Sequence, residues 1–245
     1  MLWYVKKDTI LFDKIRFWEK TPLPYFISMI KIGFPSAVQE SLYCGISMIL
    51  TKFVTGWGDT AVAVQRVGGQ IESLSWMTAE GFGMAINAFV GQNYGAKQYG
   101  RVRGIYRLAI ACDLAVSLVG FLLFQLCPRQ IISIFGNGDA LYFEFAVKFM
   151  RTFLFMVLFN GVQLISSNFF SAIGKPLKGL ILSMTRQVIF LIPLLIILPR
   201  VLGGIDGILY AAPVADAIAF LTTVLFISRE MKRIRRLEAG QSAAG

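Results

Sequence analysis

Six long apolar runs constrain the fold of this chain more than any other feature. They extend over residues 30–54, 61–94, 105–127, 141–173, 177–198 and 205–227. Each reaches the roughly 20 residues that an α-helix needs to cross the hydrocarbon core of a bilayer. The runs lack the alternation of barrel strands, and a helix satisfies its backbone hydrogen bonds internally. The sequence therefore predicts an all-α membrane protein built as a six-transmembrane-helix bundle.

The composition favours a membrane protein over a nucleic-acid-binding protein. The chain of 245 residues is 56% hydrophobic, contains 21 Phe and has a mean hydropathy of +0.65. A soluble domain of this size cannot bury so much apolar surface. The net charge of +10 would suit nucleic acid, but basic residues of membrane proteins collect in cytoplasmic loops. We therefore expect membrane lipid as a partner, and no nucleic acid.

The positions of Lys and Arg predict the orientation of the chain. Lys and Arg are frequent in segment 1–29, in the loops after the second and fourth runs, and in the tail. The loop after the first run contains neither residue, the loop after the third contains only Arg129, and the loop after the fifth contains only Arg200. By the positive-inside rule both termini are cytoplasmic. We expect a cytoplasmic linker with a membrane-surface segment over 1–29, a six-helix transmembrane lobe over 30–228 and a basic cytoplasmic tail over 229–245.

A glycine-rich basic stretch, FVGQNYGAKQYGRVRG at 89–104, joins the second and third runs. It lacks the spacings GxxxxGK[ST] and GxGxxG of nucleotide-binding loops. We expect a tight cytoplasmic hairpin, in which Gly91 and Gly95 end one helix and Gly100 and Gly104 begin the next. A generic basic loop would explain the charges but not the glycine spacing.

Side chains suited to catalysis or metal binding are scarce. The chain contains no His, and Cys44, Cys112 and Cys127 occur singly inside apolar runs. This composition excludes a histidine proton relay and gives no metal motif. No nucleophile, base and orienting group occur together. We expect no enzymatic activity and no cofactor.

Several motifs give the chain a family resemblance. GFPSAVQESL opens the first run, QRVGGQIESL and EGFGMAINAFVGQNYGAKQ lie in the second, and QLISSNFFSAIGKP ends the fourth. Together they resemble the carboxy-terminal half of multidrug and toxic compound extrusion (MATE) transporters. The resemblance implies one lobe of a twelve-helix fold in the bacterial inner membrane. It also implies antiport of cationic or amphipathic drugs against protons or sodium, through a cavity between two lobes that rock.

The resemblance also implies a partner for this lobe. Each MATE lobe carries a glycine-rich hairpin, and this sequence has one copy. We interpret the opening MLWYVKK as the inner end of a preceding transmembrane helix, although an amino terminus with a short hydrophobic tip remains open. A missing amino-terminal lobe or a second copy of the chain would complete the cavity.

Charged and polar residues inside the runs are the candidates for ion coupling, because each is costly in a bilayer. On the first run Glu40 and Tyr43 share a helix face. The resemblance implies a cation-binding carboxylate about one turn deeper than Glu40, near Tyr43. The second carboxylate that the resemblance implies, on the fourth run, is replaced here by Asn160 and Gln163. Glu40 is our first candidate for the coupling residue.

The second run carries a polar stripe at steps of three and four residues, which contains Glu72, Trp76, Glu80, Gly83 and Asn87. The stripe either lines a cavity, where its acids attract cations, or forms a packed seam. For Glu80 both interpretations stay open. For Glu72 we favour neutralisation by Arg66.

Depth along the helices predicts two buried ion pairs. Arg186 on the fifth run and Asp216 on the sixth lie at similar depth, as do Asp113 on the third and Arg151 on the fourth. We expect these pairs to fix helix register rather than to relay protons.

Two further functions remain open. A lipid-linked-precursor flippase of the same superfold would need a basic cavity for pyrophosphate, whereas this half mixes acids and bases. A six-helix protein that dimerises into a pore would use rings of Glu40 and Glu80 for cation selectivity.

Overall fold

The computed structural model describes residues 22–56, 58–135, 140–202 and 205–242. The chain divides into two compact units, Met1–Phe34 and Pro35–Gly245. Most of the predicted linker 1–29 lies outside the described residues. The first described helix already begins at Leu23, directly after Pro22, with Pro24 in its first turn, where a proline needs no hydrogen-bond partner.

Every regular element in the described part of the chain is helical. The elements are α2 (Leu23–Thr55), α3 (Asp59–Gly95), α4 (Tyr99–Leu126), α5 (Pro128–Phe135), α6 (Ala140–Phe153), η1 (Leu154–Met156), α7 (Val157–Ala172), α8 (Pro176–Met184), η2 (Thr185–Leu191), α9 (Ile192–Leu202) and α10 (Ile205–Ser242). The six predicted runs correspond to α2, α3, α4, α6–η1–α7, α8–η2–α9 and α10, and α5 is a short connecting helix. The predicted six-helix bundle is confirmed.

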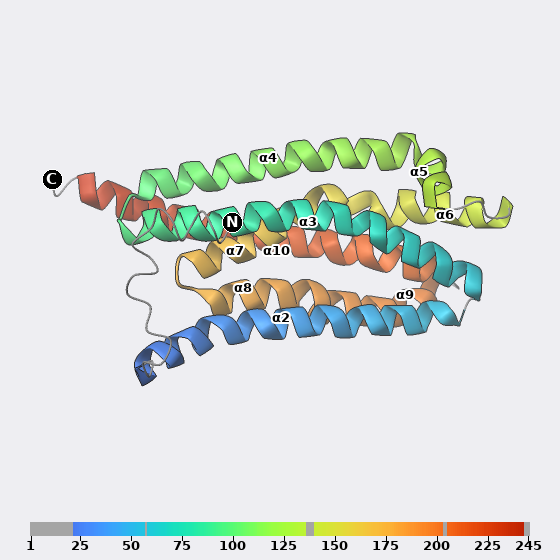
Figure 1. The fold of residues 1–245 in the computed structure, drawn as a ribbon, viewed down its shortest axis with the longest axis horizontal. Helices are drawn as coiled ribbons and strands as arrows, with labels where there is room; N and C mark the ends of the chain where they lie inside the picture. The colour runs from blue at the N-terminus through green and yellow to red at the C-terminus, as the bar shows by residue number, and fades with distance from the viewer. Residues whose placement is uncertain (1–21, 57, 136–139, 203–204, 243–245) are drawn as a thin grey trace, which may run out of the picture. The chain divides into compact units, whose positions relative to one another are not determined.

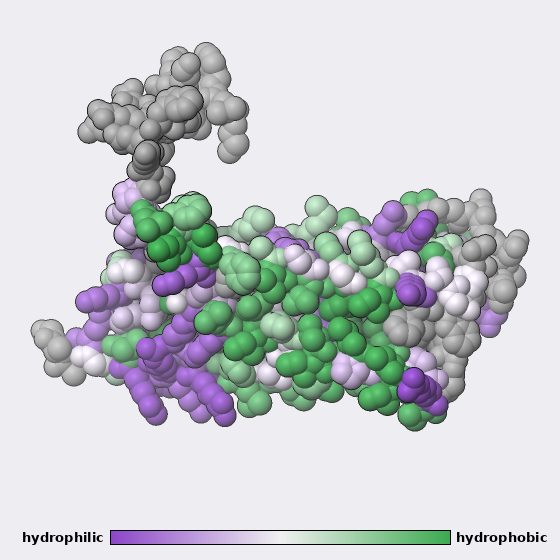
Figure 2. Space-filling view, turned by 90° about the horizontal axis from the view of Figure 1, so that it is seen from below, coloured by the Kyte–Doolittle hydropathy of each residue, from purple (hydrophilic) through white to green (hydrophobic). Residues whose placement is uncertain are grey.

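Four described segments are long and apolar enough to cross a membrane: Tyr99–Leu126, Tyr142–Ala172, Pro176–Val201 and Leu209–Gln241. Helices α2 and α3 are as long, but they carry the acidic candidates Glu40, Glu72 and Glu80. Figure 2 shows hydrophobic residues over the middle of the helices and hydrophilic residues toward the ends, most densely at one of them. That distribution is typical of a multi-pass membrane protein.

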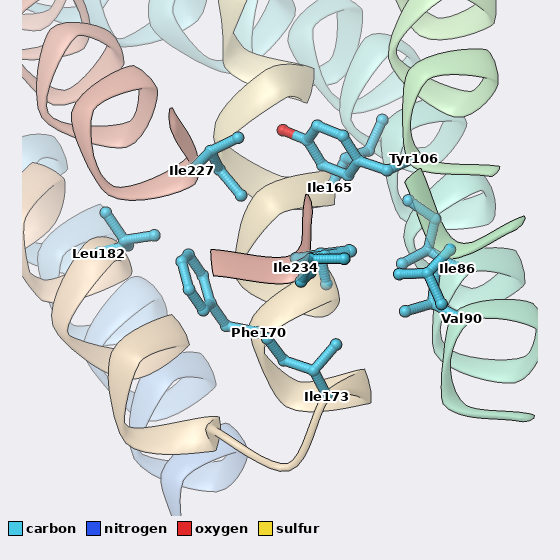
Figure 3. Close-up of a cluster of buried hydrophobic side chains, with 11 residues drawn as sticks. Ile86, Val90, Tyr106, Ile165, Phe170, Ile173, Leu182, Ile227 and Ile234 are labelled. Atoms are coloured by element: carbon cyan, nitrogen blue, oxygen red, sulfur yellow. The ribbon is translucent and has the colours of Figure 1, made fainter. Parts of the chain in front are cut away.

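Helix α7 is the centre of the second unit, because it packs against α3, α4, α8 and α10. One apolar cluster around Ile165, Phe169 and Phe170 joins it to α3, α4, α8 and α10 (Figure 3). Within a bilayer, helix association depends on close packing, which small residues permit. A Cβ at Gly179 of α8 would lie 2.7 Å from the Ser167 carbonyl oxygen of α7, so this glycine sets the α7–α8 approach.

The fifth membrane segment contains a π-helical stretch, η2, between α8 and α9. Pro193 follows this stretch closely, has no N–H to donate to residue 189 and would clash with its carbonyl in a regular α-helix. A wider turn relieves both problems, and π-turns often occur at functional sites. The stretch turns Arg186 and Gln187 into the bundle, where both are buried.

The glycine-rich hairpin forms as predicted in place, but its turn differs from the prediction. Helix α3 ends at Gly95 and α4 begins at Tyr99, and the residue in the left-handed region is Lys97, with φ 58°. Gly100 instead lies against α10, since a Cβ there would be 2.8 Å from an oxygen of Glu238. Of the four glycines, Gly100 is therefore the one that a helix contact requires, and none of them supplies the left-handed residue of the turn.

The predicted tail is largely part of a helix. Helix α10 continues to Ser242, well beyond the apolar run that ends at residue 227. Arg103 of α4 pairs with Glu238 on this extension. In Figure 1 the α3–α4 turn, the α7–α8 turn and the carboxyl end of α10 lie at the same end of the second unit. This common end carries the basic residues that the sequence assigns to the cytoplasmic side.

Candidate functional site

A buried ion pair lies at the middle of the second unit. Arg186 of η2 donates from Nε to Oδ1 of Asp216 on α10 across 2.5 Å. Both residues are buried, at 8% and 6% exposure. This is the pair that the depth of the two residues predicts. An isolated charge at such a position would be very costly, so the pair and its surroundings must act as one electrostatic unit.

Two aromatic side chains cover one side of this pair. The Arg186 guanidinium carbon lies 5.9 Å from the centre of the Trp76 ring of α3, within cation–π range. Trp76 stacks in turn on Tyr43 of α2, with ring centres 5.3 Å apart and planes 25° from parallel. The aromatic stack therefore links α2 and α3 to the charged centre on η2 and α10.

Arg186 lines two neighbouring cavities. The larger, of about 120 Å³, also has Tyr43, Gln65, Glu72 and Gln187 in its wall. The smaller, of about 30 Å³, is lined by Gln39, Glu40, Tyr43, Trp76, Asn160, Gln163, Leu164, Ser183, Arg186 and Gln187. The fold thus brings the candidates Glu40, Tyr43, Glu72, Asn160 and Gln163 to one place around Arg186.

Glu72 has a different neutralising partner from the one that the sequence suggests. Arg66 is exposed, whereas Glu72 lines the larger cavity beside Arg186 and is electrostatically attracted to it. Six residues along an α-helix amount to a rotation of about 240°, so Arg66 and Glu72 cannot share a face. The expected neutralisation by Arg66 is therefore wrong, and the cation that shares a cavity with Glu72 is Arg186.

Glu40 and Tyr43 occupy the outer part of this site. Both are exposed, Tyr43 at 40%, although both also line the smaller cavity. Tyr43 lines the larger cavity as well, because it lies one turn further along α2 toward Arg186. Glu40 is thus an acid at the rim, able to meet a ligand before that ligand reaches the buried pair.

The polar residues of α7 divide into two kinds. Gln163 is buried and donates from its amide to the Leu182 carbonyl oxygen at 3.0 Å, so its donor group holds α7 to α8. Asn160 is half-buried and lines both the smaller cavity and a third one that it shares with Glu72 and Gly161. Asn160 therefore lies between the cavity that contains Glu40 and the one that contains Glu72.

The remaining part of the α3 stripe packs against α7. The Asn87 amide donates to Asn168 Oδ1 at 2.8 Å, and a side chain at Gly83 would overlap Asn168. This end of the stripe is a helix–helix contact, away from the Arg186 centre. Glu80 is half-buried, about two turns of α3 from Glu72.

Asp113 does not pair with Arg151 in the described structure. The Asp113 carboxylate is fully buried and neither oxygen has a hydrogen-bond partner, while Arg151 is exposed. The carboxylate packs directly on Gly161, where any side chain would overlap it. Gly161 lies ten residues past Arg151, about 15 Å along the helix. The depth argument failed here because the α6–η1–α7 segment is long: Arg151 lies 21 residues from its end at Ala172 and Gly161 only 11, whereas Asp113 lies 14 residues from the start of α4 at Tyr99.

The geometry gives the site a net negative character. Among the described residues that line the two cavities, the acids Glu40 and Glu72 outnumber the single cation Arg186, which is itself paired with Asp216 behind them. Such a lining attracts cations, and its aromatic wall can stack against a flat organic cation. The sequence missed Gln187 and gave Trp76 only as a stripe residue. Pro193 was the available signal, because a proline at this place favours the π-turn that directs Gln187 into the bundle.

Comparison with known proteins identifies the family. The family model described as MatE matches residues 35–197, a range that includes α3, α4, α7 and nearly all of the site.

The chain belongs to the MatE family.

Curated relatives of this MatE chain have names from multidrug export. The "Probable multidrug resistance protein YoeA" of Bacillus subtilis is 26% identical over 164 residues, which are 66% of this chain and 35% of that protein. The "Multidrug export protein MepA" of Staphylococcus saprophyticus is 20% identical over 227 residues, 93% of this chain and 49% of that protein. The MatE chain thus spans between a third and a half of the length of these relatives.

Solved structures share the fold. The MATE multidrug transporter DinF-BH is 32% identical, with a TM-score of 0.73 over 82% of this chain and 46% of that one. The Vibrio cholerae MATE transporter VcmN in the bent form is 19% identical, with a TM-score of 0.80 over 91% of this chain and 50% of that one. The described MatE chain therefore has the fold of one lobe of these transporters.

Proposed function

We propose that this chain forms the second six-helix half of a cation-coupled multidrug efflux antiporter of the MATE type. Its substrates are small cationic or amphipathic drugs, and the coupling ion is a proton or sodium. The other half of the cavity comes from an amino-terminal lobe or from a second copy of the chain. The names of the relatives support the substrate class, and their greater length supports the need for a second half.

The observation that carries the proposal is the acidic site around Arg186. Glu40 and Glu72 outnumber the one cation among the described lining residues, and that cation is already paired with Asp216, so a cationic ligand gains favourable electrostatics there. A flippase for pyrophosphate-linked lipids would need the opposite sign. The exposed position of Glu40 and Tyr43 on α2 suits a surface that a second half would cover.

In the proposed orientation the basic end of the unit faces the cytoplasm, in the bacterial inner membrane. Lys97, Arg101 and Arg103 in the first hairpin, Lys175 and Lys178 in the second, and the basic residues of the α10 extension lie at this end. The positive-inside rule places such residues on the cytoplasmic side, together with both termini.

The test is drug efflux driven by an imposed gradient. Vesicles that contain the complete transporter are loaded with ethidium, and efflux is measured under a proton gradient and, separately, under a sodium gradient. Glu40→Gln should abolish the response to the coupling ion, because the amide keeps the shape of the side chain and removes its charge. Glu144→Gln, a matched change at an exposed acid of α6, should leave efflux unchanged.

Two outcomes would contradict the proposal. Unchanged efflux and unchanged ion dependence in Glu40→Gln would remove Glu40 from coupling. Efflux that responds to neither gradient in the unmodified transporter would remove the antiport mechanism itself.

A further inference from the structure

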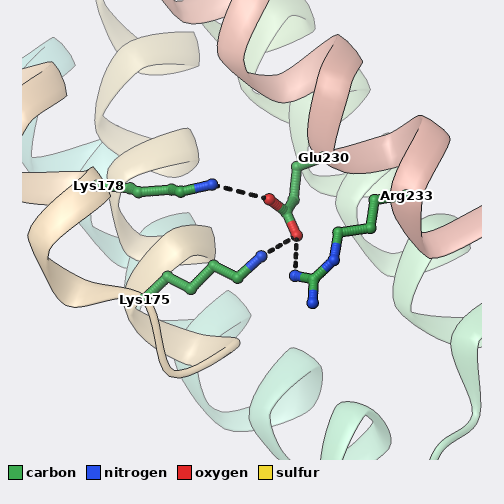
Figure 4. Close-up of polar contacts among 4 residues, drawn as sticks. All are labelled: Lys175, Lys178, Glu230 and Arg233. Atoms are coloured by element: carbon green, nitrogen blue, oxygen red, sulfur yellow. Dashed lines mark hydrogen bonds and ion pairs between the residues drawn. The ribbon is translucent and has the colours of Figure 1, made fainter.

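A second charged cluster lies at the basic end of the second unit, far along α10 from the Arg186 site. Its centre is Glu230 of α10, which is only 3% exposed. Three cations hold the carboxylate: Lys175 from the turn before α8, Lys178 from α8 and Arg233 from α10 (Figure 4). Three positive charges thus surround one negative charge, and the cluster carries a net charge of about +2.

The carboxylate of Glu230 accepts one hydrogen bond from each of the three cations. Lys175 and Arg233 both donate to Oε1, the latter at 3.1 Å, and Lys178 donates to Oε2 at 3.3 Å. Lysine has three N–H donors and arginine has five, so most of the donors in the cluster remain unused by Glu230. Glu230 therefore gathers the cations without neutralising them.

The unused donors are accessible from outside the protein. The side chains of Lys178 and Arg233 are 46% and 54% exposed, whereas that of Lys175 is 21% exposed. Lys178 and Arg233 bind different oxygens of the same carboxylate, so both exposed cations lie within one small region of the surface. The guanidinium fork of Arg233 matches a phosphate group in particular.

Apolar side chains continue outward from the same place. Leu177 and Ile181 of α8, on either side of Lys178 along the helix, are 66% and 49% exposed. The Lys178 ammonium also lies 5.9 Å from the centre of the Phe170 ring. A charged head beside exposed apolar residues, at the end of membrane-spanning helices, matches a phospholipid with its head group at the interface and its chains along α8.

We propose that the cluster of Lys175, Lys178 and Arg233 around Glu230 is a binding site for the phosphate of an anionic phospholipid. The lipid phosphate would link the α7–α8 turn to α10, in addition to the ion pairs that Glu230 already makes between them. The site is independent of the coupling ion and of the drug. Only its assignment to the inner leaflet rests on the proposed orientation.

The experiment measures lipid binding to the purified full chain in nanodiscs. Wild-type protein is titrated with phosphatidylglycerol in a phosphatidylcholine background, and bound lipid is counted by native mass spectrometry. Lys178→Gln with Arg233→Gln should weaken phosphatidylglycerol binding about 25-fold, from about a fivefold loss for each direct hydrogen bond to the phosphate that is removed. Lys175 stays on Glu230 in this variant, so the buried carboxylate keeps a partner.

The matched control removes two charges at the same end. Arg235→Gln with Arg236→Gln changes two exposed arginines of the same helical extension and should leave the affinity within about twofold. The single variant Lys178→Gln gives the same readout, with a smaller loss, if the double variant does not fold. A parallel titration with inorganic phosphate separates a lipid site from a site for free anions.

Three results would overturn the proposal. The first is an equal loss of phosphatidylglycerol affinity in the cluster variant and in the control. The second is undiminished phosphatidylglycerol binding by the cluster variant. The third is binding of inorganic phosphate as tight as that of the lipid. Nanodiscs present lipid to both ends of the protein, so a wrong orientation would not alter this result. Failure of drug efflux would likewise leave it unchanged.

Discussion

Replacement of Arg186 tests whether the centre of the site is an electrostatic unit of two acids and one base. Arg186→Met removes the cation and leaves both Asp216 and Glu72 inside the bundle without it. Loss of one partner of a buried ion pair costs about 3–5 kcal/mol in free energy of unfolding. Because two acids lose their cation here, we expect the upper end of that range.

Asp216→Asn should cost less than Arg186→Met. Arg186 keeps the attraction of Glu72, and the amide oxygen can still accept its hydrogen bond. We expect the free energy of unfolding to fall by about 1–3 kcal/mol, because the hydrogen bond to Arg186 weakens and the buried cation is only partly compensated. The difference between the two single variants therefore reports the share of Glu72 in neutralising Arg186.

The double variant Arg186→Met with Asp216→Leu completes the cycle. Removal of both charges eliminates the desolvation of the pair, so its stability should lie above that of Arg186→Met. Each variant is unfolded in a denaturing detergent titration and followed by tryptophan fluorescence, to which Trp76 beside Arg186 contributes. Arg129→Met, at an exposed position, is the control and should change stability by less than about 0.5 kcal/mol.

Equal destabilisation by Arg186→Met and Asp216→Asn would refute the role assigned to Glu72. A double variant no more stable than Arg186→Met would refute the account of the pair as a coupled unit. In that case Arg186 would act through packing, by its contact with Trp76.

Further predictions concern the contact between α4 and α7 and the two hairpins. Gly161→Ala should destabilise the protein by about 1–3 kcal/mol, because the new methyl group overlaps the Asp113 carboxylate, and most of that loss should disappear in a background of Asp113→Ala. A full loss in both backgrounds, measured in the same detergent titration, would mean that Asp113 is not the obstacle. Lys97→Gly should stabilise the α3–α4 hairpin by about 1 kcal/mol, since glycine adopts φ 58° without strain. Gly174→Ala, at φ 74° in open space, should cost about the same amount in the α7–α8 turn, and opposite signs in thermal unfolding midpoints check both substitutions.

The positions of the membrane-spanning segments could be predicted from the sequence, because the length of a helix and the depth of a residue along it depend only on residue number. The apolar runs predict each transmembrane segment, because a bilayer of fixed thickness demands about the same helix length wherever it is crossed. The same one-dimensional argument correctly places Arg186 level with Asp216. The motifs of the second run, which carry the resemblance, also lie within the residues that the MatE model matches.

Partners across helices were harder to infer, because they depend on rotation and on kinks. Asp113 and Arg151 pass the depth test, but the α6–η1–α7 segment sets Gly161 against Asp113. Glu72 was assigned to a neighbour on its own helix, whereas its cation comes from η2, more than a hundred residues away. Glu40, Asn160 and Gln163 were named separately, and only the packed bundle places them around one cavity.

The sequence by itself determined that this chain crosses the membrane as helices, which charged residues lie within the helical runs and which family it resembles. The tertiary structure decided which of those charges meet. The physical reason is that hydrophobicity acts on each segment alone, whereas an ion pair between two helices forms only where the fold brings both side chains within about 4 Å. Which side chains come that close depends on the rotation of each helix, on the π-turn before Pro193 and on the small residues of α7. These features involve several helices at once, so the sequence of one segment does not reveal them.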